Sequence, residues 1–438
     1  MILRIDDTDV ERNTEASLQS IFDGLNWLGL SWDEFYRQSD RIELHREMAW
    51  QIFANGHAYR DFTPAHQGEE DRGGAGGPWL FNQEARDLSA QESQRRADAG
   101  EPFVLRFKVP RDAPRYIKFP DAVYATQSKS VNDIEDFALL RSNAMPTYHM
   151  ASCADDIDIK ISHVIRGQDH LSNTFKHILI FEALGAPPPV FAHLPLLVAP
   201  DGAKLSKRKH GPVVSVMTYE AAGFLPQAYI NFLCLLGWSP KDNREQLSRQ
   251  ELIDVFSFEG INRSNAVVNF SEADPIDPKA HWLNSQHLRA MPIEELAPMV
   301  RERVVRAGLP IPYTDAEWPT VVDVLRTRLS TLNDFAVLAR AYFVDEYETV
   351  PKALDNLNAA GAREALRELG SRLAATEEFS EASIEAELRK LAEERGLKAG
   401  VLINGSRAAL TGQPVGPSAF HVFTALGRAQ SIERLLKV

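Results

Sequence analysis

Hydrophobic and polar positions follow two different periods along the first half of the chain. Apolar runs and two-residue alternation predict strands, whereas apolar residues three or four positions apart predict helices. The predicted strands are residues 2–5, 103–109, 136–140, 146–151, 160–165 and 190–198, the last turning at residues 200–202. The predicted helices begin at Asn13 or Thr14, at Asp40 and at Ser172, and they end at Gly29, Gly56 and Gly185. Alternating strands and helices predict an α/β domain with a mostly parallel sheet.

From about residue 215 the period becomes helical almost throughout. The candidate helices are residues 218–236, 247–256, 293–307, 319–343 and 361–396. Residues 66–78 carry five glycines and a proline, which predicts a loop. The pattern therefore predicts an α/β half followed by an all-helical half, without an internal repeat.

Composition narrows the class of protein. With 438 residues, 44% hydrophobic and 25% charged, the chain has the balance of a folded protein of two or three domains. No apolar run approaches the roughly 20 residues of a membrane span. The start lacks the pattern of a signal peptide, and two cysteines can form neither a disulfide framework nor a four-cysteine zinc site. We expect a cytoplasmic protein, with Cys234 a small buried hydrophobe.

Charge alone does not identify a partner. The net charge of −13 does not favour nucleic-acid binding, yet a local basic groove can still bind phosphates. Residues 204–209 hold four cations within six positions, directly after a predicted strand and turn. Such cations can neutralise charge that develops on a phosphoryl group. Taken alone, a solvated basic loop is the more common interpretation.

Two further segments place polar side chains at strand ends. Arg166 follows a predicted strand, where ligands bind in open α/β sheets, and its guanidinium could hold a carboxylate. An equally weighted alternative is a structural pair between Arg166 and Asp169, with His170 only flanking a helix cap. Tyr148 could present its hydroxyl to a small substrate, although a half-buried strand tyrosine is the more common case.

The acidic cluster near the start allows two interpretations. Asp6, Asp7 and Asp9 could bind a metal ion or a substrate amine. Carboxylates are also favoured where a helix begins, because the helix dipole is positive there. We favour this second interpretation for Asp7 and Asp9.

Taken together and in order, these segments resemble the bacterial glutamyl-tRNA synthetases, which are class I aminoacyl-tRNA synthetases. The resemblance covers nearly the whole chain, and residues 204–208 stand in the place of the family's Lys-Met-Ser-Lys-Ser signature. The segments that carry it are residues 3–9, 27–30, 137–141, 146–149, 164–171, 193–197, 204–208, 223–238 and 407–412.

The resemblance implies roles for the residues around the reacting groups. Lys207 would contact ATP and stabilise the transition state of adenylate formation, with Lys204 as its catalytic partner. The backbone of Leu196 and Leu197 would read the adenine. In the helical half, Arg328 would bind tRNA at the anticodon.

Four residues would hold the glutamate substrate. Arg166 and Tyr148 match positions that bind it, and Asp6 stands near its amine where the family usually has Glu. Ser152 replaces a common Asn, and Gln168 replaces a Glu beside Arg166. Residues 271–275 look like a short insertion, and the zinc-ligand cysteines of some members are absent, so we expect no structural zinc.

The resemblance also implies the domain organisation and the partners. Residues 1–211 would form a Rossmann-like catalytic domain with a connective, acceptor-binding subdomain inserted at about 46–150. Residues 212–290 would form a helical stem-contact domain, and residues 291–438 an all-helical anticodon-binding domain. The implied substrates are L-glutamate, ATP with Mg²⁺, and tRNA(Glu). The family is usually monomeric, and neither DNA nor a membrane is expected to take part.

The expected catalytic domain is incomplete at its N-terminus. In the family, a His-Ile-Gly-His signature and a glutamate-recognising arginine lie upstream of the segment with which this sequence begins at Met1. Either the chain is part of a longer protein or the protein is a catalytically inactive tRNA-binding paralogue. A third interpretation is a glutamyl-queuosine tRNA(Asp) synthetase, but those enzymes lack the helical domain that the residues after 285 would form.

Overall fold

The computed structural model describes residues 1–8, 14–64 and 80–438. Asp9, Asn13 and the predicted loop at 66–78 lie outside these residues. The chain forms two compact units, called here the N unit and the C unit. The N unit comprises Met1–Leu205, Cys234–Asn243 and Ile253–Val268, and the C unit comprises Ser206–Leu233, Arg244–Leu252 and Asn269–Val438.

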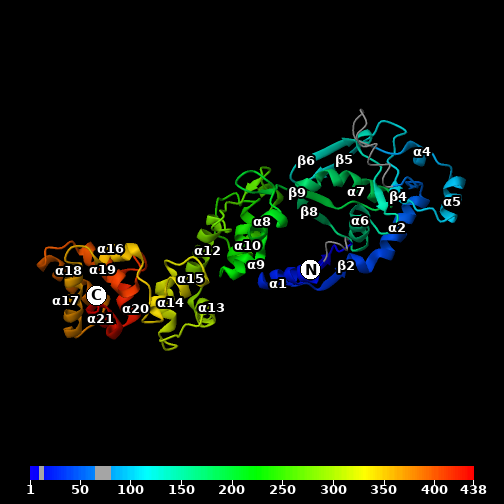
Figure 1. Cartoon of the computed structure of the whole chain (residues 1–438). Helices are drawn as coiled ribbons and strands as arrows, with labels where there is room; N and C mark the ends of the chain where they lie inside the picture. The colour runs from blue at the N-terminus through cyan, green and yellow to red at the C-terminus, as the bar shows by residue number, and fades with distance from the viewer. Residues whose placement is uncertain (9–13, 65–79) are drawn as a thin grey trace. The chain divides into compact units, whose positions relative to one another are not determined.

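A four-stranded sheet in the N unit has the order β6-β5-β9-β8 (Figure 1). Strand β9 (Val190–Leu194) runs parallel to β8 (His163–Gly167) and to β5 (Tyr116–Asp121), and β6 (Ala125–Ser130) is antiparallel to β5. The predicted parallel sheet is thus present, with one antiparallel edge strand. Smaller sheets accompany it: parallel β1 (Ile2–Ile5) with β2 (Glu34–Arg37), parallel β10 (Leu197–Val198) with β11 (Ala266–Val267), and antiparallel β3 (Ala58–Asp61), β4 (Val104–Phe107) and β7 (Ala138–Leu140).

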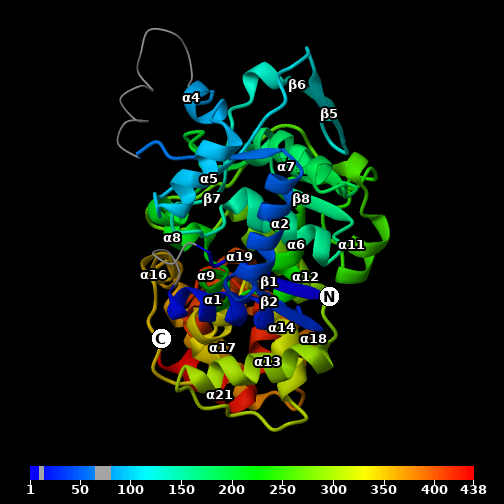
Figure 2. The same cartoon turned by 90° about the vertical axis from the view of Figure 1, so that its right-hand side faces the viewer.

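Helices of the N unit pack on one another and on the sheet. Its helical elements are α1 (Glu15–Trp27), η1 (Gln38–Arg41), α2 (Ile42–Ala54), α4 (Gln83–Arg86), α5 (Ala90–Asp98), η3 (Val131–Asp133), α6 (Tyr148–Asp158), η4 (Gln168–His170), α7 (Leu171–Ala183) and η5 (Phe258–Gly260). Helix α6 contacts α2 and α7, and α7 covers β5 (Figure 2). The ring of Phe119 lies 5.2 Å from Phe175 of α7 and 5.7 Å from Phe191 of β9, so aromatic burial joins sheet to helix.

The C unit is helical, as the sequence predicts. Its helical elements, of which α10 and α11 continue into the N unit, are α8 (Lys207–Val214), α9 (Val216–Ala221), α10 (Pro226–Leu235), α11 (Arg249–Val255), α12 (Pro278–Ala290), α13 (Ile293–Arg306), α14 (Trp318–Arg326), α15 (Leu332–Val337), η6 (Arg340–Tyr342), α16 (Pro351–Leu357), α17 (Ala362–Ala375), α18 (Glu381–Glu394), α19 (Ala399–Thr411), α20 (Ala419–Leu426) and α21 (Arg428–Leu436). Buried Leu, Val and Ala side chains from α12 to α21 form one apolar core.

The strand prediction for residues 146–151 is wrong, because α6 begins at Tyr148. Thr147 before it is extended, with φ −82° and ψ 164°, so only the entry to the helix has strand geometry. These six residues of mixed polarity are compatible both with the two-residue period of a strand and with the 3.6-residue period of a helix. The longer pattern decides for a helix, since Met150 and Cys153 are buried while Tyr148 lies on another face.

Three other boundaries differ from the prediction. Lys160 has a positive φ of 61° in the turn after α6, so the strand predicted at 160–165 begins only at His163. The cap of α7 is His170 rather than Ser172, which lies in the first turn. The strand predicted at 190–198 ends at Leu194, because Pro195 has no N–H for a sheet hydrogen bond.

Three predicted long helices are each divided in two or more pieces. Gly223, at φ 82°, separates α9 from α10. Thr331 and Ser380 form capping boxes that start α15 and α18, within the stretches 319–343 and 361–396. Local cap signals therefore override a continuous helical period.

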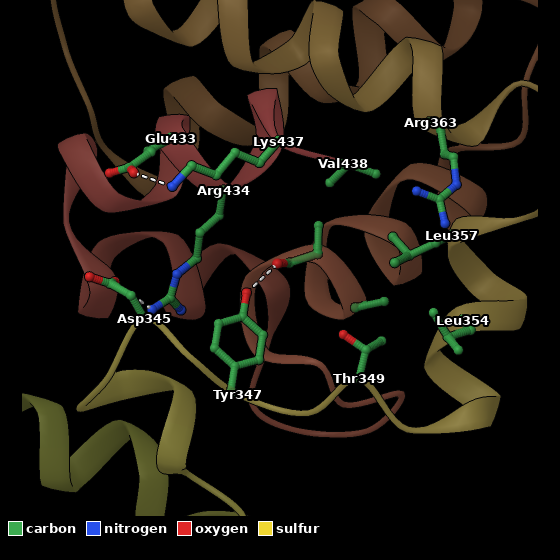
Figure 3. Close-up of a pocket in the computed structure, with 12 residues that line it drawn as sticks. Asp345, Tyr347, Thr349, Leu354, Leu357, Arg363, Glu433, Arg434, Lys437 and Val438 are labelled. Atoms are coloured by element: carbon green, nitrogen blue, oxygen red, sulfur yellow. Dashed lines mark hydrogen bonds and ion pairs between the residues drawn. The ribbon is translucent and has the colours of Figure 1, made fainter. Parts of the chain in front are cut away.

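A cavity of about 320 Å³ opens among the last helices of the C unit, and Arg434 supports its wall (Figure 3). The guanidinium of Arg434 donates to the carbonyls of Leu410, at 2.6 Å, and of Val344, at 3.1 Å. It also lies over the ring of Tyr347, with 4.6 Å between the guanidinium carbon and the ring centroid. Because Arg434 is only 7% exposed, it takes the place of water at the Leu410 carbonyl near the end of α19 and at the Val344 carbonyl after η6.

We expect Arg434→Met to lower the free energy of unfolding by about 2–4 kcal/mol, because two carbonyls lose a charged donor. Urea unfolding followed by circular dichroism measures this change. The matched control is Arg389→Met, whose side chain is 57% exposed and pairs with Glu385 one turn away. The control should change stability by at most about 0.5 kcal/mol. Equal losses in the two variants would contradict the buried role of Arg434.

Candidate active site

A cavity of about 350 Å³ lies in the N unit between β1, α6 and β8. Its walls contain the four residues that the sequence predicts to hold glutamate, although these come from segments far apart in the chain. The lining residues are Ile2, Arg4, Asp6, Tyr148, Ser152, Asp156, Ile159, Ile161, His163, Val164, Ile165 and Arg166. Of the predicted site residues, this geometry brings Asp6, Tyr148, Ser152 and Arg166 together.

Arg166 is held in place by neutral groups. Its guanidinium donates to the hydroxyl of Tyr148 at 3.1 Å, to the hydroxyl of Thr174 at 2.8 Å and to the carbonyl of His170 at 3.4 Å. The alternative pair between Arg166 and Asp169 is wrong, because the Asp169 carboxylate bonds to Lys204. Arg166 thus keeps its positive charge for a ligand.

A buried pair behind Arg166 fixes its orientation. The Nδ1 atom of His193 lies 2.5 Å from the carboxylate of Asp121, and both side chains are fully buried. Its Nε2 atom faces Nε of Arg166 at 3.4 Å and the hydroxyl of Thr174 at 3.1 Å. Burial lowers the pKa of His193, although Asp121 opposes the shift. A neutral ring with Nδ1 protonated then accepts from Arg166 without adding a competing charge.

The cavity also contains a carboxylate and an unpaired hydroxyl. Asp6 accepts from Nε of Arg4 at 2.8 Å and is 44% exposed. The hydroxyl of Ser152 is buried and has no hydrogen-bond partner among the described residues. Burial raises the pKa of Tyr148 despite Arg166, so the phenol stays a neutral donor. The cavity therefore offers a cation, hydroxyl groups and a carboxylate to one ligand.

Asp7 has a different role from Asp6. Its carboxylate accepts from the backbone N–H of Ser39 at 2.8 Å and from the Ser39 hydroxyl at 2.7 Å. It therefore caps η1, which leads into α2, and not the helix that follows it in sequence. Asp7 therefore stabilises the start of a helix, as expected, but the helix is η1 and not the one that follows Asp7 in the sequence.

The two predicted lysines differ in their surroundings. Nζ of Lys204 lies 2.5 Å from Asp169, whose pKa is lowered by this bond. A Cβ on Gly167 would lie 2.5 Å from the same carboxylate, so a larger residue there would require the Asp169 side chain to shift. Lys207 is exposed and begins α8, which Ser206 caps by accepting from the N–H of Lys209.

The predicted adenine-reading strand is already hydrogen-bonded. The N–H of Leu196 donates to Asn265 at 3.1 Å, and its carbonyl accepts from Ala266 at 2.9 Å. The carbonyl of Leu197 accepts from Leu205 at 3.0 Å. A contact between adenine and this backbone would use the remaining lone pairs or compete with these bonds, and the assignment stays a prediction.

Nearby, the departure at Gln168 has a structural explanation. The side chain of Gln168 accepts from the Tyr124 hydroxyl at 2.7 Å and donates to Asn265 at 2.7 Å. These neutral bonds need an amide, which can both accept and donate. A carboxylate could not make the second bond.

In the C unit, Arg328 lies exposed after α14. Burial, together with the nearby charge of Arg328, lowers the pKa of Arg407 on α19, while Tyr342 opposes the shift. Arg328 therefore lies close enough to Arg407 for the two positive charges to interact, and such a pair of cations suits a phosphate ligand.

Sequence reasoning missed the groups that orient Arg166, namely Thr174, His193 and Asp121. The signal in the sequence that points to these groups is His193, which lies in an apolar strand, because a buried polar ring needs a hydrogen-bond partner. Of the cysteines, Cys153 is buried but Cys234 is only half-buried, contrary to expectation. In the part of the chain that the structure describes, no helix is long and apolar enough to cross a bilayer.

Comparison with known proteins adds independent findings. Residues 1–274 match the family model for the catalytic domain of class I tRNA synthetases (E and Q), and residues 286–438 match a model for an anticodon binding domain. The chain is 54% identical to a glutamate–tRNA ligase of Solibacter usitatus, over 99% of this chain and 91% of that protein. It is 36% identical to the glutamate–tRNA ligase of Thermus thermophilus, over 99% and 91%.

A solved structure agrees with the sequence comparisons. A glutamate tRNA ligase from Elizabethkingia meningosepticum, crystallised in complex with its amino acid, matches with a TM-score of 0.84 at 29% identity. The match covers all of this chain and 91% of that one.

Proposed function

Because the chain belongs to the class I tRNA synthetases for glutamate and glutamine, we propose that it is a glutamate–tRNA ligase. It activates L-glutamate with ATP and transfers the glutamyl group to the 3′ end of tRNA(Glu). One observation carries this proposal: Asp6, Tyr148, Ser152 and Arg166 line a single cavity, which therefore presents a guanidinium and a carboxylate to the same ligand.

The cavity suits glutamate better than glutamine. In the proposal, Arg166 pairs with the side-chain carboxylate, and the Tyr148 hydroxyl donates a supporting hydrogen bond. Asp6 binds the ammonium group, and the unpartnered Ser152 hydroxyl bonds to the substrate between them. A neutral amide would leave the Arg166 charge without a counter-charge, which disfavours glutamine.

Activation joins the α-carboxylate of glutamate to ATP. A carboxylate oxygen attacks the α-phosphorus, the bond from this phosphorus to the bridging oxygen breaks, and pyrophosphate leaves with the electron pair. Lys207 and Lys204 stabilise the charge that builds on the phosphates, and Lys204 exchanges Asp169 for phosphate. The backbone of Leu196 and Leu197 contacts the adenine. Mg²⁺ bound to the ATP phosphates would screen their charge; no group of three metal-binding side chains occurs among the described residues.

Transfer to tRNA completes the reaction. The ribose hydroxyl at the 3′ end of the tRNA attacks the glutamyl carbonyl, and AMP leaves. Arg328 binds the anticodon end, in the segment that matches an anticodon-binding domain. The same proposal includes domain boundaries at residues 211 and 290 and an inserted subdomain at about 46–150. It also includes a monomeric state, a cytoplasmic location and the absence of structural zinc.

Exchange of label between pyrophosphate and ATP tests the proposal. We expect exchange that needs both glutamate and tRNA(Glu), and that glutamine does not support. Exchange with glutamate but without tRNA would contradict the expected tRNA dependence. Binding of tRNA without any exchange would identify the inactive paralogue. The match of residues 286–438 to an anticodon domain argues against the glutamyl-queuosine alternative.

A further inference from the structure

One face of α6 supplies three polar residues to the cavity. Tyr148, Ser152 and Asp156 are each four positions apart, so they form a row along the helix, and all three line the cavity. The family resemblance implies roles for Tyr148 and Ser152 but none for Asp156. The row ends on a carboxylate, about two helical turns from Tyr148, the residue that contacts Arg166.

Arg4 joins this carboxylate to Asp6. Nε of Arg4 lies 2.8 Å from Asp6, and its Nη1 lies 2.9 Å from Asp156. Each carboxylate uses one oxygen for this contact, and the second oxygen has no hydrogen-bond partner among the described residues. Two carboxylates around one guanidinium leave this wall with a net negative charge, which a ligand cation can neutralise.

The neighbouring carboxylate on α6 is not available to a ligand. Asp155 is fully buried and bonds to Arg41 at 2.7 Å, to His45 at 2.8 Å and to Gln38 at 3.1 Å. It therefore anchors η1 and α2 to α6. Asp156 points to another face, and its side chain remains 11% exposed.

Two observations indicate that this wall meets a ligand. The hydroxyl of Ser152, in a residue only 4% exposed, lines the cavity without a partner among the described residues. Burial raises the pKa of Asp156 even though Arg4 opposes the shift. A second cation beside Asp156 would offset the cost of burying its charge.

We propose that Asp156 is a further substrate-binding residue, which together with Asp6 holds the ammonium group of glutamate, and that Arg4 positions both carboxylates. This inference rests on the proposed function, because it assumes that glutamate occupies the cavity. It assigns the ammonium to a pair of carboxylates and not to Asp6 alone.

Calorimetric binding of two ligands tests the inference. Glutarate carries the same two carboxylates as glutamate but lacks the ammonium group. Asp156→Asn keeps the shape and an acceptor for Arg4, so we expect it to weaken glutamate binding about ten- to a hundredfold. Glutarate binding should change less than about threefold, because that ligand makes no use of the lost charge. Arg4→Lys, which can hold only one carboxylate well, should also weaken glutamate selectively.

The matched control is Asp158→Asn, on the same helix. The carboxylate of Asp158 bonds to Arg41 and does not line the cavity, so neither ligand should be affected. If Asp156→Asn weakens both ligands equally, Asp156 is structural; if it changes neither, the assignment is wrong. Wild-type protein that binds neither ligand would overturn the proposed function itself. If Arg166→Ala abolishes binding of both glutamate and glutarate, this result would support the proposed function independently of the effect of Asp156→Asn on binding.

Discussion

Replacing Lys207 with alanine is expected to lower the rate of glutamyl-adenylate formation about 100- to 1000-fold. Its ammonium group is exposed at the start of α8 and free to follow the phosphates. A cation that acts on developing phosphate charge works mainly in the transition state, so the affinity for tRNA should change little. Single-turnover adenylation and tRNA filter binding measure the two quantities.

Lys209→Ala is the matched control for Lys207, since it removes an equal charge from the same helix turn. It should lower the rate less than about fivefold if the position of the charge matters. Equal losses of rate and of tRNA affinity in Lys207→Ala would show a general electrostatic role. Equal losses of rate in Lys207→Ala and Lys209→Ala would also show a general electrostatic role, because the position of the charge would then not matter.

Arg166→Ala is expected to raise the glutamate concentration required for half-maximal rate about 30-fold or more, because loss of one partner of a buried charged pair costs about 2–5 kcal/mol. Discrimination against glutamine should fall as well, because the charge that selects the carboxylate is gone. Steady-state kinetics with both amino acids measures these effects. The neighbouring Tyr148→Phe removes only a neutral donor and should cost about 1 kcal/mol.

Arg115→Ala is the control for Arg166. This arginine is 44% exposed, pairs with Glu182, and lies outside the cavity lining. Its loss should leave the kinetics for glutamate unchanged. If Arg166→Ala leaves glutamate kinetics unchanged while tRNA binding collapses, Arg166 is a structural or tRNA-contacting residue.

Much of the fold follows from local signals in the sequence. The period change near residue 215 predicted a helical second half, and the alternation before it predicted the parallel sheet. Errors fall where short patterns fit both periods, as at Tyr148, or where a cap divides a long helix, as at Thr331. Pairing across the sheet, such as β5 beside β9, depends on contacts far apart in sequence, which periodicity does not encode.

The candidate site was predictable only in part. Arg166 and Tyr148 stand out because a strand end and a helix start expose polar side chains. Their orientation depends on Asp121, 72 positions from His193 in the sequence, and no local pattern signals that pair. Asp156 is hidden for the same reason, because its role follows from Arg4, which is 152 positions away.

The most direct test of the account is the charging of purified tRNA(Glu) with labelled amino acid by this protein in the presence of ATP. We expect that glutamate is attached to the tRNA and that glutamine is not. We also expect that Arg166→Ala loses most of this activity at low glutamate concentration. Binding of tRNA(Glu) without any attachment of glutamate, or attachment that is unchanged by Arg166→Ala, would contradict it.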